Sequence, residues 1–426
     1  MTSGSGAHLV DVTLFHSPTS GGVRRYLDAK HAWLAAHHPD WQHTMLVPGD
    51  REARVVGGRS TLPGIPIPGT FNYRLPLNPR AWSRALAALE PDLIEVGDAF
   101  HTAWAARGVA RRRGVPLVGF YHSNLPHLVR RRYGEPGRRL AAAYVRLTYS
   151  RFDRVLAPSR FMCDALRELG VDHVRHQPLG VDPGIFHPSR RTRDLRGELG
   201  LPRDARLLVF AGRFSQEKRI DVLRAAFRRL GRPYQLLLLG GAETRQLDDN
   251  VFARPFRADS RDLASWLASA DALVHAGTEE TFGLVVLEAM ACGRPVVATR
   301  ASALPELISD EVGLLARPDD PADLAAAIAG LYDLDTEAMG RAARARVLAR
   351  FTWTHAFSGL MTHYATLLAR PSMVPSAAAI SVAAAVSAAQ PSFTSSNTVS
   401  FPLRSPTATW RPSGDQRTQD GSESVR

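Results

Sequence analysis

Short apolar runs and longer segments of helical periodicity alternate along the chain. The runs are too short for helices and are typical of buried strands. They lie at 9–15, 92–96, 116–121, 155–159, 206–211, 235–239, 251–256, 272–274, 296–298 and 313–315. Helical segments separate most of them, which predicts an α/β fold around parallel sheets. In such folds, ligands bind at the carboxyl ends of the strands.

A segment rich in glycine and proline, LGVDPGIFHP at 179–188, divides these elements into two similar halves. Segments of this kind mark domain boundaries. We therefore expect an N-terminal domain over 1–180, a C-terminal domain over 181–352 and a closing helix over 353–370. Ser, Ala, Thr and Pro dominate 371–426. That composition buries too little apolar surface to fold and predicts a disordered tail.

The stretch 271–299, DALVHAGTEETFGLVVLEAMACGRPVVAT, combines a strand, a polar loop, a short helix and a second strand. Loop-forming residues at 277–281 end the first strand, and helix formers follow over 282–292. Gly293 is placed for a left-handed helix C-cap, and Pro295 stops the helix from continuing. The stretch therefore predicts a β-loop-α-β unit.

Two carboxylates frame the start of this helix. Glu280 precedes it, and Glu288 lies about one turn beyond its start at roughly 3.6 residues per turn, so both can face one pocket. Between them, the backbone N–H groups of Phe282, Gly283 and Leu284 form an anion site. A glutamate here can simply compensate the helix dipole. Glu288, however, lies in an apolar helix, where a carboxylate needs a partner. The set suits a sugar attached to a diphosphate, because the amides can bind phosphate and the acids can bind hydroxyls.

Three further loops follow predicted strands and carry candidate ligand contacts. Gly21 and Gly22 lie between the first strand and the first helix, where glycines let backbone amides approach a ligand. His122 directly follows a later strand. Arg213 and Lys218 lie on a strand-to-helix loop of the second half, where two cations can bracket a diphosphate. Structural alternatives stay open for each: a glycine turn, a packed histidine, or a structural salt bridge to Glu217 or Asp221.

The charge of the chain favours an anionic partner. The formal net charge of the 426 residues is +12, carried almost wholly by arginine, because Lys30 and Lys218 are the only lysines. Nucleotide phosphates, nucleic acid and an anionic lipid surface all suit that charge. No nucleic-acid recognition module is visible, so nucleic acid is not an expected partner. The segment 127–154 places arginines among Leu, Val, Tyr and Phe, and it suits either an anionic membrane surface or solvent.

Other features narrow the class of protein. Cys163 and Cys292 lack metal-ligand spacing, which argues against a disulfide framework or a zinc site and favours a reducing compartment. The N-terminal residues lack the regions of a signal peptide, and no run reaches the roughly 18 apolar residues of a membrane span. Asp333 and Asp335 have the spacing of a metal-binding DxD motif, but they follow a helix in polar sequence, and we expect them at the surface. The expected location is cytoplasmic, or peripheral at the inner face of the plasma membrane.

These motifs together resemble glycosyltransferase family 4. The resemblance rests on TEETFGLVVLEAMACGRPVV with its Glu280-x7-Glu288 spacing, on GRFSQEKRIDVL upstream, on the early Gly-Gly loop and on LGVDPGIFHP, and it covers about residues 8–368. It implies the glycosyltransferase B fold, in which two Rossmann-like domains face each other across a cleft. The N-terminal domain would bind the acceptor and the C-terminal domain the sugar nucleotide. The implied reaction is hexose transfer with retained configuration, without a metal or another cofactor.

The resemblance also implies roles for the matching residues of the second half. Arg213 and Lys218 would hold the diphosphate, and Glu288 the ribose hydroxyls. Glu280 would contact the donor hexose, and amides near Gly283 would bind the hexose or the phosphate.

From the first half, the resemblance implies that Gly21 and Gly22 close on the phosphates and that His122 lies beside the sugar and the leaving group. One departure is visible. Residues 301–303, Ala-Ser-Ala, stand where the family often has glycines before Pro-Glu, which weakens the expectation of phosphate contacts from this loop.

The expected function is transfer of a hexose from GDP-mannose or a UDP-hexose to an envelope lipid or glycan acceptor. The segment 122–126, HSNLP, resembles the sequence of family members that glycosylate lipids. A non-hydrolysing sugar-nucleotide epimerase is an alternative, but it would need an acid or base pair at the sugar that is not visible. An inactive nucleotide-sugar-binding membrane scaffold is another, but such a scaffold has no reason to keep Arg213, Lys218, Glu280 and Glu288 together.

Overall fold

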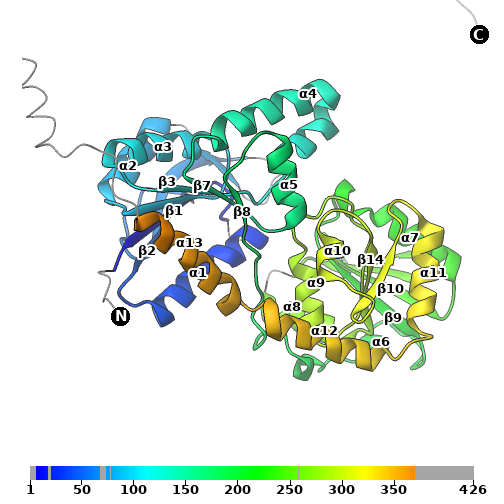
Figure 1. Cartoon of the computed structure of the whole chain (residues 1–426). Coiled ribbons are helices and arrows are strands. Elements are labelled where there is room, and N and C mark those ends of the chain that lie inside the picture. The colour runs from blue at the N-terminus through cyan, green and yellow to red at the C-terminus, as the bar shows by residue number, and fades with distance from the viewer. Residues whose placement is uncertain (1–5, 18–20, 68–72, 77, 258, 370–426) are drawn as a thin grey trace, which may run out of the picture. The chain divides into compact units, whose positions relative to one another are not determined.

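Two mostly parallel β-sheets, one in each half of the chain, organise the protein (Figure 1). The computed structural model describes residues 6–17, 21–67, 73–76, 78–257 and 259–369. They belong to one unit, Met1–Val374, whereas the predicted tail lies outside the described residues.

The first sheet has the strand order β4-β3-β2-β1-β5-β6-β7-β8. Its strands are β1 (His8–Val12), β2 (Gln42–Gly49), β3 (Arg59–Pro66), β4 (Arg74–Pro76), β5 (Leu93–Val96), β6 (Leu117–Phe120), β7 (Arg154–Ala157) and β8 (Val174–His176). Among the described strand pairs of this sheet, only β3–β4 is antiparallel. The central strands are buried throughout, which explains their continuous apolar runs.

The second sheet has the order β11-β12-β10-β9-β13-β14-β15. Its strands are β9 (Arg206–Ala211), β10 (Tyr234–Gly241), β11 (Arg245–Asp248), β12 (Val251–Pro255), β13 (Ala272–His275), β14 (Val296–Thr299) and β15 (Gly313–Ala316). All pairs are parallel except β11–β12. The predicted α/β architecture with two Rossmann-like halves is confirmed.

Helices connect the strands and cover the sheets. They are α1 (Gly22–His37), α2 (Pro79–Ala88), α3 (His101–Arg113), α4 (Leu125–Tyr149), α5 (Arg160–Glu168), α6 (Leu195–Glu198), α7 (Ile220–Leu230), α8 (Ser260–Ser269), α9 (Leu284–Ala291), α10 (Leu304–Leu307), α11 (Pro321–Leu331), α12 (Thr336–Arg350) and α13 (Trp353–Leu368), with short 3-10 turns η1 (Pro188–Arg190) and η2 (Gln216–Lys218). Several begin at a capping side chain, such as Ser159 before α5 and Asp320 before α11. None of the described helices has the length and apolar character that crossing a bilayer requires.

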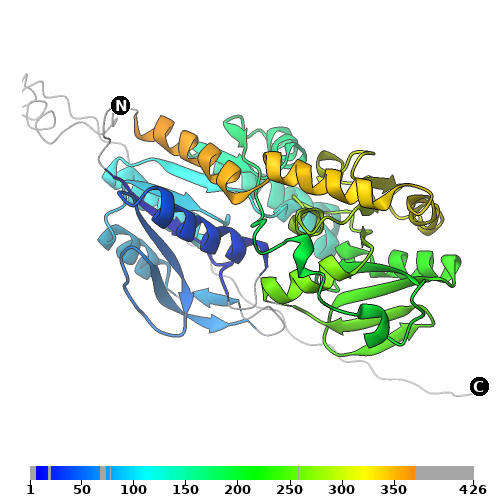
Figure 2. The same cartoon turned by 90° about the horizontal axis from the view of Figure 1, so that it is seen from below.

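The closing helix α13 returns to the first half of the chain. It lies beside α1 in both views (Figures 1 and 2). Before it, Val181 and Thr352 form an isolated parallel bridge between the two connecting segments. The hydroxyl of Tyr364 on α13 donates to buried Glu95 of β5. The exact domain boundaries stay predictions, but the chain clearly crosses between the halves twice.

The helix predicted over 282–292 is shorter at both ends. Gly283 takes a left-handed φ of 96°, so α9 begins at Leu284, and Gly293 with φ 72° follows its end. The sequence pattern missed β2 and α12 altogether. In α12 the buried positions Met339, Ala343 and Val347 recur every four residues, but small and charged residues separate them.

Candidate functional site

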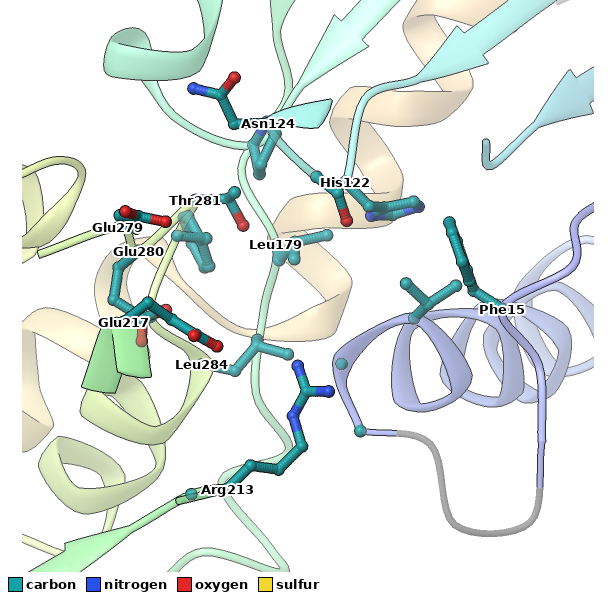
Figure 3. A pocket seen from close by; sticks show the side chains of 18 of the residues that line it. Phe15, His122, Asn124, Leu179, Arg213, Glu217, Glu279, Glu280, Thr281 and Leu284 are labelled. Carbon is teal, nitrogen blue, oxygen red and sulfur yellow. The ribbon is translucent and has the colours of Figure 1, made fainter. Parts of the chain in front are cut away.

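A cavity of about 780 Å³ lies between residues of the two halves (Figure 3). From the first half, the loops after β1 and β6 and the start of α1 line it. From the second, the loops after β9 and β13 and the start of α9 line it. Every residue predicted for the site lines this cavity: Gly21, Gly22, His122, Arg213, Lys218, Glu280, Phe282, Gly283, Leu284 and Glu288. Their individual roles stay predictions.

The start of α9 presents backbone N–H groups to the cavity. Gly283 is its N-cap residue and offers no side chain to cap the first turn. The first N–H groups of a helix have no partner within it, so they are available to an anion. A Cβ at Gly283 would meet Leu304 at 3.3 Å, and its φ of 96° is strained for other residues. The glycine therefore sets the direction in which these amides point.

Glu280 is held by two basic side chains. Lys218 Nζ donates to its Oε1, and Nε2 of fully buried His275 lies 2.9 Å from the same oxygen. Burial opposes ionisation, but attraction to Lys218 and the contact with His275 outweigh it and lower the pKa of Glu280. The N–H of Gly277 donates to His275 Nδ1, whereas Nε2, although close to Glu280, makes no hydrogen bond among the described residues. Glu280 is thus a fixed anion at the cavity wall.

Lys218 forms its salt bridge with Glu280, itself a predicted site residue, and not with Glu217 or Asp221, the two acids of the structural alternative. Glu217 instead pairs with Arg131 of α4, at 2.6 Å between Oε2 and Nη1. Asp221 lies 3.3 Å from Arg219. The ammonium of Lys218 therefore stays at the cavity rather than in a surface pair.

Glu288 is buried and pairs with Arg25, a residue of α1 that the sequence did not single out. Burial raises the pKa of Glu288, and Arg25 opposes that rise. The second carboxylate oxygen, Oε2, has no hydrogen-bond partner among the described residues. Glu288, a lining residue of the cavity, therefore keeps a buried acceptor without a partner.

Arg213 follows β9 through Gly212, and its guanidinium points into the cavity (Figure 3). Burial raises the pKa of Tyr73 in the first half, and the charge of Arg213 lessens the rise. The cation therefore acts across the cavity.

His122 lines the opposite side of the cavity from the acidic loop (Figure 3). Its ring stacks on Phe120 at 4.3 Å and meets Tyr26 edge-on at 5.2 Å. Burial, with a smaller contribution from Lys30, lowers the pKa of His122 to about 3. It is a neutral imidazole at neutral pH, suited to hydrogen bonding.

A buried charge network lies behind His122. Lys30 Nζ is 2.8 Å from Asp11 and 2.7 Å from Glu95, and all three side chains are almost wholly buried. Burial alone would raise the pKa of Asp11, but Lys30 and His43 outweigh burial and lower this pKa to about 2. The network ties α1 to the neighbouring strands β1 and β5.

The loop that departs from the family pattern also lines the cavity. Ser302 has a left-handed φ of 51°, a conformation that favours glycine, and its hydroxyl donates to the Thr278 carbonyl. The Ala303 N–H donates to the carbonyl of Glu280 at 3.2 Å. This loop supports the acidic loop even without the glycines.

Among the residues that the structure describes, no cluster of three or more His, Cys, Asp or Glu side chains could hold a metal ion. Asp335 of the DxD segment accepts a hydrogen bond from the Ala338 N–H at the start of α12. Asp333 and Asp335 are exposed, as expected.

The two halves of the chain match two family models. Residues 20–184 match Glycosyltransferase Family 4, and residues 205–333 match Glycosyl transferases group 1. A GDP-mannose-dependent alpha-(1-6)-phosphatidylinositol dimannoside mannosyltransferase of Mycobacterium tuberculosis is 33% identical over 374 residues, covering 83% of this chain and 94% of the relative. A GDP-mannose-dependent alpha-mannosyltransferase of Corynebacterium glutamicum is 28% identical and covers 73% of each chain.

Solved structures share the fold. The sucrose-phosphate synthase of Thermosynechococcus elongatus matches with a TM-score of 0.71 at 24% identity, covering 85% of this chain and 99% of that one. Both halves therefore match the family in order, and a relative above 30% identity is covered almost end to end. The chain belongs to glycosyltransferase family 4.

Proposed function

We propose that this glycosyltransferase transfers a hexose from a nucleoside diphosphate sugar to an envelope lipid or glycan, with retained configuration. The observation that carries the proposal is the single cavity in which Arg213, Lys218, Glu280 and Glu288 meet the start of α9. Cations and helix amides suit the diphosphate, and fixed carboxylates suit hydroxyls.

In this proposal the reaction depends on stabilising the leaving group. Negative charge grows on the diphosphate as the bond to the sugar breaks, and prearranged cations and amides stabilise it. Arg213, Lys218 and the first amides of α9 supply these groups. The acceptor attacks from the face that the diphosphate leaves, and the leaving phosphate takes the acceptor proton. Glu280 orients the hexose, and no side chain serves as nucleophile.

GDP-mannose is the first candidate donor, with UDP-hexoses as the alternative. Two similar relatives are named as GDP-mannose-dependent mannosyltransferases. One of them acts on a phosphatidylinositol dimannoside by its name, which supports a lipid-linked acceptor for this chain. Neither the epimerase nor the inactive scaffold gains support from these relatives.

A thermal-shift panel tests the donor site. GDP-mannose, UDP-glucose and ADP-glucose are added to the full-length protein without metal and with EDTA. A true donor at about 100 times its dissociation constant should stabilise the protein by roughly 2.7 kcal/mol. The proposal predicts such a shift for GDP-mannose or UDP-glucose and its loss in Lys218→Ala. It fails if none of the sugars shifts the melting temperature.

We also propose that α4 lies against an anionic membrane surface. The helix bends at Gly134, where φ is 62°, and it exposes the large apolar side chains Tyr133 (67%) and Leu140 (76%) among arginines. Arginines near an anionic surface contribute about 1 kcal/mol each, and apolar side chains add insertion. A solvated helix has no need of these two apolar residues.

Flotation with phosphatidylglycerol vesicles tests this surface. The wild-type protein should float with anionic vesicles, and less so at high salt or with neutral vesicles. The Tyr133→Ser/Leu140→Ser variant should float less. Leu334→Ser, which removes another exposed apolar side chain in the second half, should behave as the wild type. Equal flotation with neutral and anionic lipid would refute the membrane proposal and leave the transferase proposal intact.

A further inference from the structure

The ion pair between Arg25 and Glu288 joins the two halves of the protein inside the cavity. Arg25 lies on α1, within one turn of the glycine pair, and Glu288 lies on α9. Nη1 of Arg25 donates to Oε1 of Glu288, and both residues line the cavity. The paired carboxylate therefore exists only while α1 lies against α9.

The other oxygen of Glu288 lacks a partner. Oε2 is buried without a hydrogen bond among the described residues, although Glu288 is only 2% exposed. Buried carboxylate oxygens are nearly always hydrogen-bonded, because desolvation without a partner is costly. An ionised carboxylate can only accept hydrogen bonds. The missing partner must therefore be a donor, such as a hydroxyl that enters the cavity.

The starts of the two helices are in close contact near this pair. A Cβ at Gly22 would lie 3.2 Å from Cδ1 of Leu284, so a side chain at this position would have to displace the leucine. Arg25 is also the group that opposes the effect of burial on the pKa of Glu288. The guanidinium thus holds one oxygen of this carboxylate and favours its ionised form.

We propose that Arg25 is a positioning residue for ribose recognition. It occupies Oε1 of Glu288 and leaves Oε2 for a ribose hydroxyl of the nucleotide, so the ribose is recognised only while α1 lies against α9. This inference rests on the proposed function, because it takes the cavity as the nucleotide-sugar site. Ribose binding and the approach of the two halves then favour each other.

Calorimetric titration with two nucleotides tests this role. GDP, or UDP where the donor panel selects it, is compared with its 2′,3′-dideoxy counterpart, which lacks both ribose hydroxyls. The wild type should prefer the ribonucleotide by about tenfold or more, because a hydrogen bond to a charged group is lost. In Arg25→Gln and in Glu288→Gln the preference should fall towards one. Arg25→Lys, which keeps the positive charge but lacks the planar guanidinium, should give an intermediate ratio.

The ratio separates positioning from a merely structural role. A variant that only loosened α1 would weaken both nucleotides equally and keep the ratio. Arg24→Gln is the matched control, because it removes the same charge one residue earlier and Arg24 is not among the lining residues. It should keep the wild-type ratio.

Three results would overturn the inference. The first is a folded Arg25→Gln or Arg25→Lys protein with the full wild-type ratio. The second is a wild type that binds the two nucleotides alike, which would leave the proposed function standing. The third is a wild type that binds neither nucleotide, which would also refute the proposed function.

Discussion

At the scale of single residues, each charge at the cavity is set by a specific partner. Lys218 and His275 hold Glu280 as an anion, and burial keeps His122 neutral with a pKa of about 3. Arg25 is the partner of buried Glu288. Because these charges are fixed before a ligand enters, the site can stabilise a leaving diphosphate without rearranging.

Removing the ammonium at the cavity should slow the reaction rather than unfold the protein. Lys218→Ala should lower kcat by about 10²–10³-fold, the range for losing one preorganised stabilising group. Initial rates of hexose transfer measure the effect. Arg228→Ala, which removes an exposed cation from neighbouring α7, is the control and should keep the wild-type rate. Equal rates in both variants would remove Lys218 from the proposed machinery.

Donor binding should weaken in acid because of Glu288. Burial raises its pKa above the usual 4.5, so the carboxyl takes up a proton at a higher pH than an exposed glutamate. A hydroxyl of the ligand favours the ionised form. The dissociation constant of the donor sugar nucleotide should therefore rise as pH falls through this raised pKa.

The same titration in Glu288→Gln is the control. The variant should bind more weakly at all pH values and lack the acid step. A step that persists in the variant would assign it to another group. His122 and Glu280 should not titrate near neutral pH, because both pKa values are lowered.

The sequence predicted the residues of the cavity better than their partners. Glycines, cations and acids at the ends of strands pointed to one edge of each sheet, and all of them line one cavity. Arg25 and His275 were missed. Arg25 is one of many arginines, and only the approach of α1 to α9 singles it out. His275 ends an apolar strand, and its ring accepts from a loop N–H, a contact that spacing does not reveal.

At the scale of elements, the start of α9 is fixed by one glycine. Gly283→Ala should destabilise the protein by about 1–3 kcal/mol, because it forces a side chain into a left-handed conformation, and it should weaken donor binding by turning the first amides. Denaturant unfolding and donor titration measure both effects. Gly330→Ala in α11 is the matched control, because no atom lies within 4 Å of its added Cβ. That variant should be neutral or more stable; equal behaviour of the two variants would contradict the role of Gly283.

The element pattern was predictable wherever apolar runs were continuous. Buried central strands such as β9 and β13 have such runs, and turn residues marked their ends. The strand β2 and the helix α12 were missed. A histidine and a threonine precede the short apolar run of β2, although both are buried. The apolar periodicity of α12 is weak in the sequence, because alanine and glycine make up part of its buried face.

At the scale of the whole molecule, α13, the last helix of the described chain, packs against the first half. Lys30 contacts Asp11, Glu95 and the hydroxyl of Tyr364, at 3.3 Å for the last. One buried cation therefore links β1, β5 and the closing helix. This position explains one of the two lysines in a chain that otherwise uses arginine.

Removing that cation should destabilise the fold. Lys30→Met should lower the free energy of unfolding by about 3–5 kcal/mol, because it leaves buried carboxylates without their cation. Chemical denaturation measures the loss. The double variant Lys30→Met/Asp11→Asn should recover part of it, since one uncompensated charge is removed as well. If the free energy of unfolding of the single variant fell by less than about 1 kcal/mol, the Lys30 network would not be important for stability.

The most direct measurement follows labelled hexose from donor to acceptor. Full-length protein is incubated with radiolabelled GDP-mannose or UDP-hexose, polar lipids and EDTA, and the lipid product is separated and digested with anomer-specific glycosidases. We predict label in a glycolipid with the donor's α configuration, and a loss of about 10²-fold or more in Lys218→Ala. Release of free hexose alone, an inverted linkage, or equal transfer by Lys218→Ala would contradict the account.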